Sequence, residues 1–255
     1  MRTISVERYV TPLREGGSLP AIVEGDDLGL YVLKFRGAGQ GPRALIAEAI
    51  AGGIARALGL LVPEIVLADL DPLLARTEPD PEIQDLIRAS AGLNLALDYL
   101  PGAATFDPLV DAVSDDLASR IVWFDAFVSN VDRTARNSNL LTWHRRLWLI
   151  DHGAALYFHH SWNGSTDAAA EPFRLIRDHV LLPLADRIAA VDAELATRLS
   201  PALFAAIVSA VPADWLNDGA AATDVAVRRA AYVGYLSRRL AERSSFVQEA
   251  IGARG

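Results

Sequence analysis

The chain has 255 residues, of which 51% are hydrophobic and 22% charged, and its net charge is −8. So apolar a composition excludes a disordered chain, and the acidic balance argues against sequence-independent binding to nucleic acid and against electrostatic docking on an anionic membrane. The sequence has no cysteine, which excludes disulfides, thiolate catalysis and Cys-ligated metals.

The first part of the chain is predicted to be rich in strands. Residues 3–10, 19–25 and 30–35 are β-branched or alternate between apolar and polar positions, and turn-prone segments separate them. Pro42 then opens a predicted helix whose apolar residues recur every three or four positions, and Gly59 is its expected C-terminal cap.

Two further strands are predicted before the helical part of the chain begins. Residues 62–70 and 93–102 read as strands, the second ending in a Pro-Gly turn. Between them, residues 69–85 contain DP, EPDP and PE, and we interpret this stretch as a loop or a short irregular excursion.

Helices dominate the remainder. Residues 113–130 predict an amphipathic helix with acidic residues in its first turn, and its aromatic residues are spaced for core packing. Residues 139–153 predict two short strands around a polar turn at His144 and Arg145. Residues 172–252 contain three or four Ala- and Leu-rich helices punctuated by prolines.

The order of strands followed by helices predicts an α+β fold. We place the boundary near Pro101, so that residues 1–101 form an N-terminal lobe and residues 102–255 a helical C-terminal lobe. The N-terminus lacks an apolar core of signal-peptide length, and no run of apolar residues is long enough to span a membrane. These features predict a soluble cytoplasmic protein with no membrane partner.

Lys34 is the only lysine among 24 basic residues and ends a strand-like apolar run. A compact ammonium fits between phosphate oxygens where a planar guanidinium does not, so Lys34 is a candidate phosphate ligand. Glu48, in the helix that follows, could hold that ammonium in place. The alternative is that both are ordinary surface charges.

Two acidic motifs follow in the second half of the chain. Asp132 and Asn137 form the pattern D-x-x-x-x-N, which suits a carboxylate beside an attacking hydroxyl and an amide oxygen on Mg²⁺. Asp151 follows a buried-looking strand and precedes His-Gly, so its carboxylate could share that metal. Read singly, each motif is also compatible with a polar turn.

Taken in order, these motifs resemble the protein-kinase-like arrangement. The sequences NVDRTARNSNLL and WLIDHG resemble in particular the HipA-related kinases, and phosphatidylinositol kinases carry a related D-R-H-x-x-N loop with I-D-F-G. The motifs span residues 20–156. The resemblance implies a bilobal kinase-like fold, with a small antiparallel-sheet N-lobe that ends in a hinge and a larger helical C-lobe with the catalytic and metal-binding loops.

The same resemblance implies roles for individual residues. Asp132 would be the catalytic base, Asn137 and Asp151 the metal ligands, and Lys34 the phosphate-binding lysine with Glu48 as its partner. Residues 95–102 would be the hinge, and the backbone groups of Asp98, Tyr99 and Leu100 would lie near the adenine.

The chain departs from the family pattern at three places. Thr134 and Arg136 stand where HipA has His and Lys after the catalytic Asp, and Arg136 would take over the neutralisation of phosphate charge. His152 replaces the usual Phe. There is no G-x-G-x-x-G motif, and the Gly-rich candidate for a phosphate loop consists of Gly16, Gly17 and Ser18.

The sequence therefore predicts an ATP- and Mg²⁺-dependent phosphotransferase of HipA-like type that acts on Ser or Thr of a protein and does not bind nucleic acid directly. A kinase for a small molecule or a lipid headgroup is one alternative, because the D-R loop also occurs in phosphatidylinositol kinases. A nucleotide-binding pseudokinase or interaction module is another, and the intact Asp132, Asn137 and Asp151 weigh against it.

Overall fold

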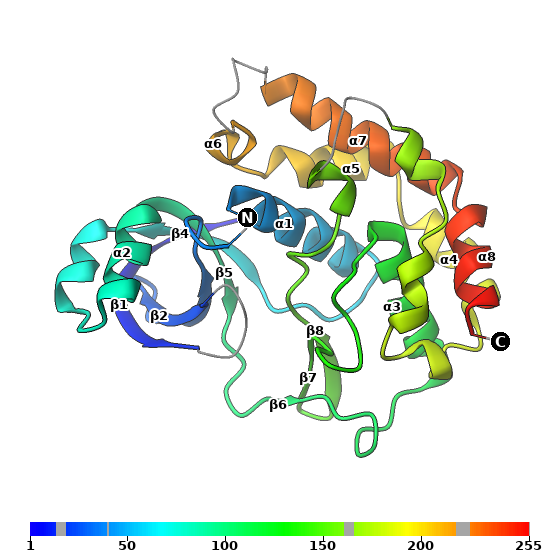
Figure 1. Ribbon diagram of the computed structural model, residues 1–255, viewed down its shortest axis with the longest axis horizontal. Coiled ribbons are helices and arrows are strands. Elements are labelled where there is room, and N and C mark those ends of the chain that lie inside the picture. Colours follow the sequence, from blue (N-terminus) through cyan, green and yellow to red (C-terminus); the bar gives the residue numbers. More distant parts are fainter. Residues whose placement is uncertain (14–18, 40, 161–165, 218–224, 255) are drawn as a thin grey trace.

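The computed structural model describes residues 1–13, 19–39, 41–160, 166–217 and 225–254. A strand-rich lobe and a helical lobe lie side by side and are joined after β5 through residues 99–103 (Figure 1). The strands are β1 (Thr3–Pro12), β2 (Ala21–Gly25), β3 (Leu30–Lys34), β4 (Ile65–Leu70), β5 (Gly92–Asp98), β6 (Ala104–Thr105), β7 (Leu140–Trp143) and β8 (Arg146–Leu149). The helices are α1 (Pro42–Ala57), α2 (Pro81–Ala89), α3 (Asp115–Val128), α4 (Ile188–Thr197), α5 (Pro201–Ser209), α6 (Ala213–Leu216), α7 (Val225–Ala241) and α8 (Ser244–Gly252). The predicted α+β class is confirmed.

The first five strands form a small closed barrel in the order β1-β2-β3-β5-β4. The neighbouring pairs along this order are antiparallel, and a parallel pairing of residues 3–5 with residues 67–69 closes the barrel. Alternate residues of β3 point to opposite faces, and Tyr31 and Leu33 are buried in the core of the barrel. Lys34 therefore lies on the other face of β3, toward α1.

Helix α1 is buried along most of its length between the barrel and the C-terminal helices (Figure 1). Two adjacent glycines allow the close approach on both sides, because a Cβ at Gly52 would collide with Ile65 of β4. A Cβ at Gly53 would lie 2.9 Å from Ile207 of α5. Glycine costs about 1 kcal/mol relative to alanine inside a helix, and tight packing is the reason for it here. The position of α1, and with it of Glu48, is fixed from two sides.

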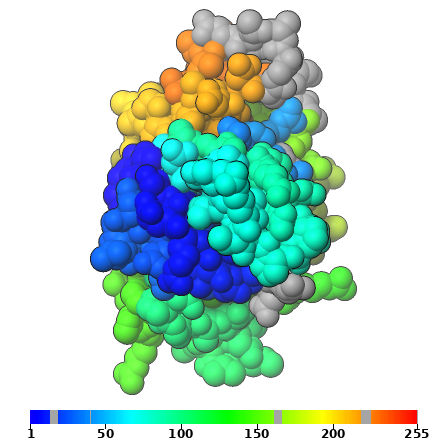
Figure 2. All heavy atoms as spheres, turned by 90° about the vertical axis from the view of Figure 1, so that its left-hand side faces the viewer, coloured from blue at the N-terminus to red at the C-terminus, as the bar shows by residue number. Residues whose placement is uncertain are grey.

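Helix α2 corrects one prediction, since residues 69–85 were expected to form a loop or a short irregular excursion. The structure contains a short 3-10 helix at Pro72–Thr77 and then α2. Asp80 caps α2 by accepting a hydrogen bond from the N–H of Glu82, and Pro81 occupies the first turn, where it lacks only an N–H that needs no partner. Two of the prolines that were taken as signs of a loop, Pro72 and Pro81, are here helix starts. Figure 2 shows this segment in cyan beside the first strands in blue, covering the barrel.

The helical lobe is built around α3, whose Trp123, Phe124 and Phe127 are fully buried as expected for core residues. Helices α4, α7 and α8 pack against α3, and α5 reaches it through Phe204, which stacks on Phe127. The described part of residues 172–252 contains five α-helices, α4 to α8, one more than the upper prediction, and α6 is a single turn of 4 residues. Trp215 on α6 donates from its indole nitrogen to the carbonyl of Leu93 on β5, at 3.1 Å, and so links the two lobes.

A three-stranded sheet, β6-β7-β8, lies where the two lobes meet. The predicted hairpin is confirmed: β7 and β8 pair around a turn in which His144 and Arg145 have φ angles of 47° and 59°, the left-handed values that tight hairpin turns require. No helix in the described ranges combines the length and the apolar character that a membrane crossing requires.

Candidate active site

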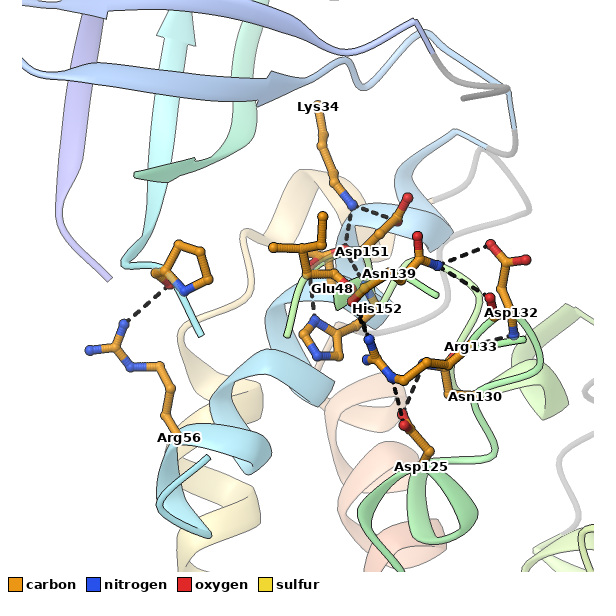
Figure 3. A network of polar contacts seen from close by, with 12 residues as sticks. Lys34, Glu48, Arg56, Asp125, Asn130, Asp132, Arg133, Asn139, Asp151 and His152 are labelled. Carbon is orange, nitrogen blue, oxygen red and sulfur yellow. Dashed lines mark hydrogen bonds and ion pairs between the residues drawn. The ribbon is translucent and has the colours of Figure 1, made fainter. Parts of the chain in front are cut away.

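Lys34 connects the two lobes through a pair of carboxylates. Its Nζ lies 2.6 Å from Oε2 of Glu48 on α1 and 2.6 Å from Oδ1 of Asp151, which follows β8. Figure 3 shows the lysine reaching from the sheet toward both. The Glu48 side chain is 0% exposed and that of Asp151 is 46% exposed, so the ammonium has one partner in the core and one at the surface.

The carboxylate of Glu48 also accepts two hydrogen bonds from His152. The backbone N–H of His152 donates to Oε2 at 2.7 Å, and its ring Nδ1 lies 3.0 Å from Oε1. Every oxygen of this buried carboxylate is therefore satisfied, as burial of a charge requires.

Burial and charge act in opposite directions on this cluster. Burial lowers the pKa of Lys34, but the negative charges of Glu48 and Asp151 outweigh it and hold the pKa well above its usual range. Burial raises the pKa of Glu48, but the positive charge of Lys34 and the hydrogen bonds from His152 hold it well below the usual range. Both groups are thus charged at neutral pH.

The mouth of the β7–β8 hairpin brings two polar residues together. The last residue before β7 is Asn139, and its carbonyl accepts a hydrogen bond from the N–H of Ile150 at 3.1 Å, next to Asp151. Asn139 and Asp151 have φ angles of 48° and 53°, in the left-handed region that residues other than glycine rarely adopt. Such conformations persist only where the surroundings impose them, and they gather at functional sites.

The carboxylate of Asp132 accepts hydrogen bonds from two of the three asparagine side chains of its loop. Its Oδ2 accepts from Nδ2 of Asn137 at 2.8 Å and from Nδ2 of Asn139 at 3.3 Å. Asn137 is exposed, whereas Asn139 is nearly buried and lies beside Asp132 on the side of Lys34 and Glu48 (Figure 3). Asn139 is thus the residue that links Asp132 to Asp151.

A second buried network lies beneath this loop. Arg133 and Asp125 of α3 form an ion pair with 2.6 Å between Nε and Oδ2, and both side chains are 0% exposed. Asp125 also accepts from Nδ2 of Asn130 at 2.9 Å and from Nε2 of His179 at 2.9 Å. His179 is the donor there because its Nδ1 accepts from the N–H of Leu181.

Arg133 also forms hydrogen bonds to the backbone at the open end of the β7–β8 hairpin. Its Nη1 donates to the carbonyl of Asn139 and, at 3.4 Å, to that of Ile150. Asn139 is one of the two residues with left-handed φ angles, and Ile150 directly precedes the second, Asp151. Burial raises the pKa of Asp125, but the charge of Arg133 outweighs it and holds the pKa well below its usual range.

The predicted hinge overlaps the end of β5, whose last residue is Asp98. The N–H of Asp98 donates to the carbonyl of Glu64 at 2.8 Å, and that of Tyr99 to Leu30 at 2.9 Å, so both are used inside the N-terminal lobe. Leu100 is buried. The phosphate-loop candidates lie outside the described residues; they are Gly16, Gly17 and Ser18. Their segment connects β1 to β2.

The structure therefore brings Lys34, Glu48 and Asp151 together, with Asp132 and Asn137 on the neighbouring loop. Arg136 is exposed on the same loop. Asn139 was not among the residues predicted from the sequence, although it stands directly before β7.

The donor chemistry matches a hard cation bound together with phosphate. Within the described ranges no three His, Cys, Asp or Glu side chains gather into a metal-binding group. Mg²⁺ is commonly held by only one or two carboxylates plus substrate phosphates and water, so a carboxylate and an amide oxygen at the hairpin mouth fit it.

The fold is similar to that of solved kinases. A crystal structure of a Helicobacter pylori proinflammatory kinase, CtkA, matches at 13% identity with a TM-score of 0.55, covering 99% of this chain and 98% of that one. A crystal structure of the Golgi casein kinase with Mn/ADP bound matches at 12% identity with a TM-score of 0.54, covering 100% of this chain and 75% of that one. At these identities the likeness shows the fold.

A comparison with curated protein sequences gives no match. A family model described as HipA-like kinase, however, matches residues 6–246. The matched range contains most of both lobes and each residue of the cluster around Lys34 and Asp132. On this evidence, the chain belongs to the HipA-like kinase family.

Proposed function

We propose that this kinase transfers the γ-phosphate of ATP, with Mg²⁺, to a Ser or Thr hydroxyl of a protein. The observation that carries the proposal is the meeting of Lys34 from one lobe with Asp151 from the other, next to the loop of Asp132 and Asn139. Phosphoryl transfer asks the protein chiefly for positioning and for neutralisation of charge. A cationic group, two partly exposed carboxylates and an amide at one place can supply both.

Lys34 would bind the phosphates of ATP. Its ammonium has three donors, and the two carboxylates that it contacts come from different lobes, so it points into the space where the lobes meet. Glu48 would anchor it there, since this carboxylate is buried and cannot itself reach solvent.

Asp151 and Asn139 would hold Mg²⁺. The amide nitrogen of Asn139 is turned toward Asp132, which leaves its oxygen for a cation. Asn137, the ligand predicted from the motif, is the alternative, and its amide nitrogen also faces Asp132. The ion held by these residues would supply positive charge to offset the negative charge that develops on the phosphate during transfer.

Asp132 would orient the acceptor hydroxyl and receive its proton. Its carboxylate is held by the two amide groups but is only partly buried, so an acceptor can reach it. Arg136, exposed on the same loop, would offset phosphate charge during transfer. Leu100 would supply the backbone N–H for the adenine, because those of Asp98 and Tyr99 already donate within the lobe.

The experiment measures binding and transfer separately. Mg-ATP should raise the melting temperature, since a ligand at about 100 times its Kd stabilises the folded state by about 2.7 kcal/mol. γ-Labelled ATP is then offered to lysate proteins and, separately, to a metabolite and lipid extract. We expect label in protein, and we expect Asp132→Asn to bind Mg-ATP while losing about 10²–10⁴-fold of the transfer rate.

Each other outcome selects a different reading. Label in the extract alone would identify a small-molecule or lipid-headgroup kinase. Binding of ATP with no label in either fraction would identify a pseudokinase. Equal transfer by the parent and Asp132→Asn would remove Asp132 as the base, and no thermal shift with any divalent metal would contradict nucleotide binding altogether.

A further inference from the structure

His152 occupies the position at which the related D-F-G motif has a phenylalanine, and its side chain is 0% exposed. Instead of only filling space, it makes two hydrogen bonds to Glu48 on α1, one from the backbone and one from the ring. The two residues are 104 positions apart in the sequence. The segment after β8 is thereby tied directly to the helix that carries the partner of Lys34.

The ring hydrogen bond has a defined direction. Glu48 is ionised, because its pKa is held far below the usual range, and a carboxylate only accepts hydrogen bonds. Nδ1 of His152 therefore carries the proton, and it donates to Oε1 at 3.0 Å. Oε2 is left to Lys34 Nζ and to the backbone N–H of His152. A phenylalanine at position 152 would keep the backbone donor but leave Oε1 without a partner.

The ring is held in place by its neighbours. Phe124 of α3 packs edge-on against it, with 5.7 Å between the ring centroids. Gly153, the next residue, lies against α1, and an added Cβ would be in ordinary contact with the Cβ of Ala44, at 3.6 Å. The imidazole thus stands between α1 and α3 with little freedom to turn, which suits a group that fixes another side chain.

We infer that His152 is a positioning residue: its Nδ1–H fixes the orientation of the Glu48 carboxylate, which in turn aims the Lys34 ammonium at the space between the lobes. The role of Lys34 in phosphate binding rests on the function proposed above. The mechanical part, that His152 fixes Glu48 and Lys34, rests on the contacts alone and can be tested without nucleotide.

A matched pair of substitutions separates the hydrogen bond from the packing. His152→Asn places an amide N–H at the position of Nδ1, whereas His152→Leu has a similar size and shape without any donor. His152→Phe is a second variant without a donor, for use if the leucine variant does not fold. Melting temperatures of all variants check folding before any comparison.

The first readout is Lys34 itself. Because the chain contains a single lysine, ¹³C,¹⁵N-lysine labelling gives a single NMR signal from a side-chain ammonium nitrogen, that of Lys34. We expect the exchange of the Lys34 ammonium protons with water to rise about ten-fold or more in His152→Leu and to stay close to the parent in His152→Asn, in proportion to the loss of a hydrogen bond to a charged group.

The second readout is the kinetics of phosphate transfer. His152→Leu should lower kcat about 10- to 100-fold with a smaller change in KM for ATP, because Lys34 keeps its charge but is no longer aimed at the transition state. His152→Asn should restore most of the rate. A purely structural role would instead make both variants equally slow, in step with their melting temperatures.

Two results would overturn the inference. One is a Lys34 signal that is the same in the parent and in the variants that lack a donor. The other is an asparagine variant that behaves like the leucine variant although it is folded. If the parent does not bind Mg-ATP, the proposed function fails, and the Lys34 signal then decides the positioning role by itself.

Discussion

Two ionic networks lie within the site, and they differ in their exposure to solvent. The cluster of Lys34, Glu48 and Asp151 joins the two lobes and opens to solvent at its half-exposed aspartate. The pair of Arg133 and Asp125 lies wholly inside the helical lobe, with no exposed side chain. An ion pair that reaches solvent can exchange a protein partner for a ligand, whereas a closed pair can only hold structure. The open cluster is suited to chemistry and the closed pair to its support.

The largest expected effect is on stability, from breaking the closed pair. Arg133→Met leaves the carboxylate of Asp125 buried without its cation, which should cost about 3–5 kcal/mol in the free energy of unfolding. Urea denaturation measures it. Arg177→Met, at an exposed arginine, is the matched control.

The double variant Asp125→Leu with Arg133→Met removes both charges and should recover part of that loss, because the uncompensated charge is then gone. If Arg133→Met alone is as stable as the Arg177→Met control, the pair of Arg133 and Asp125 does not contribute to the stability of the fold.

Breaking the open cluster should cost less stability and more binding. Among buried partners, Lys34→Met removes the cation of Glu48 alone. Arg133→Met removes the cation of Asp125 and also the hydrogen bonds to the carbonyls of Asn139 and Ile150. We expect a loss of about 1–3 kcal/mol in the free energy of unfolding, together with loss of the thermal shift by Mg-ATP. If Lys34→Met proves as destabilising as Arg133→Met and still binds nucleotide, the contrast between the two networks is wrong.

Asn139 and Asn137 can be compared as ligands of Mg²⁺ beside the cluster of Lys34, Glu48 and Asp151. Asn139→Ala should raise the Mg²⁺ concentration needed for nucleotide binding about ten-fold, which corresponds to about 1.4 kcal/mol. Asn137→Ala should change it less, because Asn137 is exposed and lies farther from the hairpin mouth in the chain. A titration of Mg²⁺ at fixed ATP, followed by melting temperature, measures both. The reverse order would favour the ligand predicted from the D-x-x-x-x-N motif.

The smallest effect is expected from mild acid. The pKa of Asp125 in the folded state is held below its unfolded value of about 4, so its contribution to stability is present above that pH and lost as the pH falls toward the folded value. Stability should therefore change little from pH 7 to pH 5 and fall below pH 4. Asp125→Asn should be less stable at pH 7 but show a shallower fall in acid, as measured by urea midpoints. A steep fall in the parent between pH 7 and 5 would contradict this assignment.

Features that depend on neighbours in sequence were predictable. The alternation in β3, the helix start at Pro42 and the hairpin at His144 and Arg145 each follow from a local pattern of residues. Lys34 stood out because it is the only lysine, and Glu48 because a carboxylate lies inside an apolar helix. The pairing of these two residues needed only the order of strand and helix.

Features that depend on distant contacts were not predictable from the sequence alone. Nothing near Arg133 in the sequence indicates that its charge is matched by Asp125, on the preceding helix, instead of by the adjacent Asp132. The bond from His152 to Glu48 likewise arises only when the segment after β8 packs against α1. The helix α2 was missed for a different reason, because proline at a helix start and proline in a loop look alike in sequence.

The closure of the N-terminal barrel bears on how the protein meets other chains. In an open sheet, the outermost strands expose unpaired backbone groups that can accept a strand from another molecule, which is a route to peptide capture and also to aggregation. Here residues 3–5 of β1 pair with residues 67–69 of β4, so these stretches satisfy each other instead of facing outward. Along them, a substrate or partner cannot be recruited by strand addition and has to be recognised through side chains.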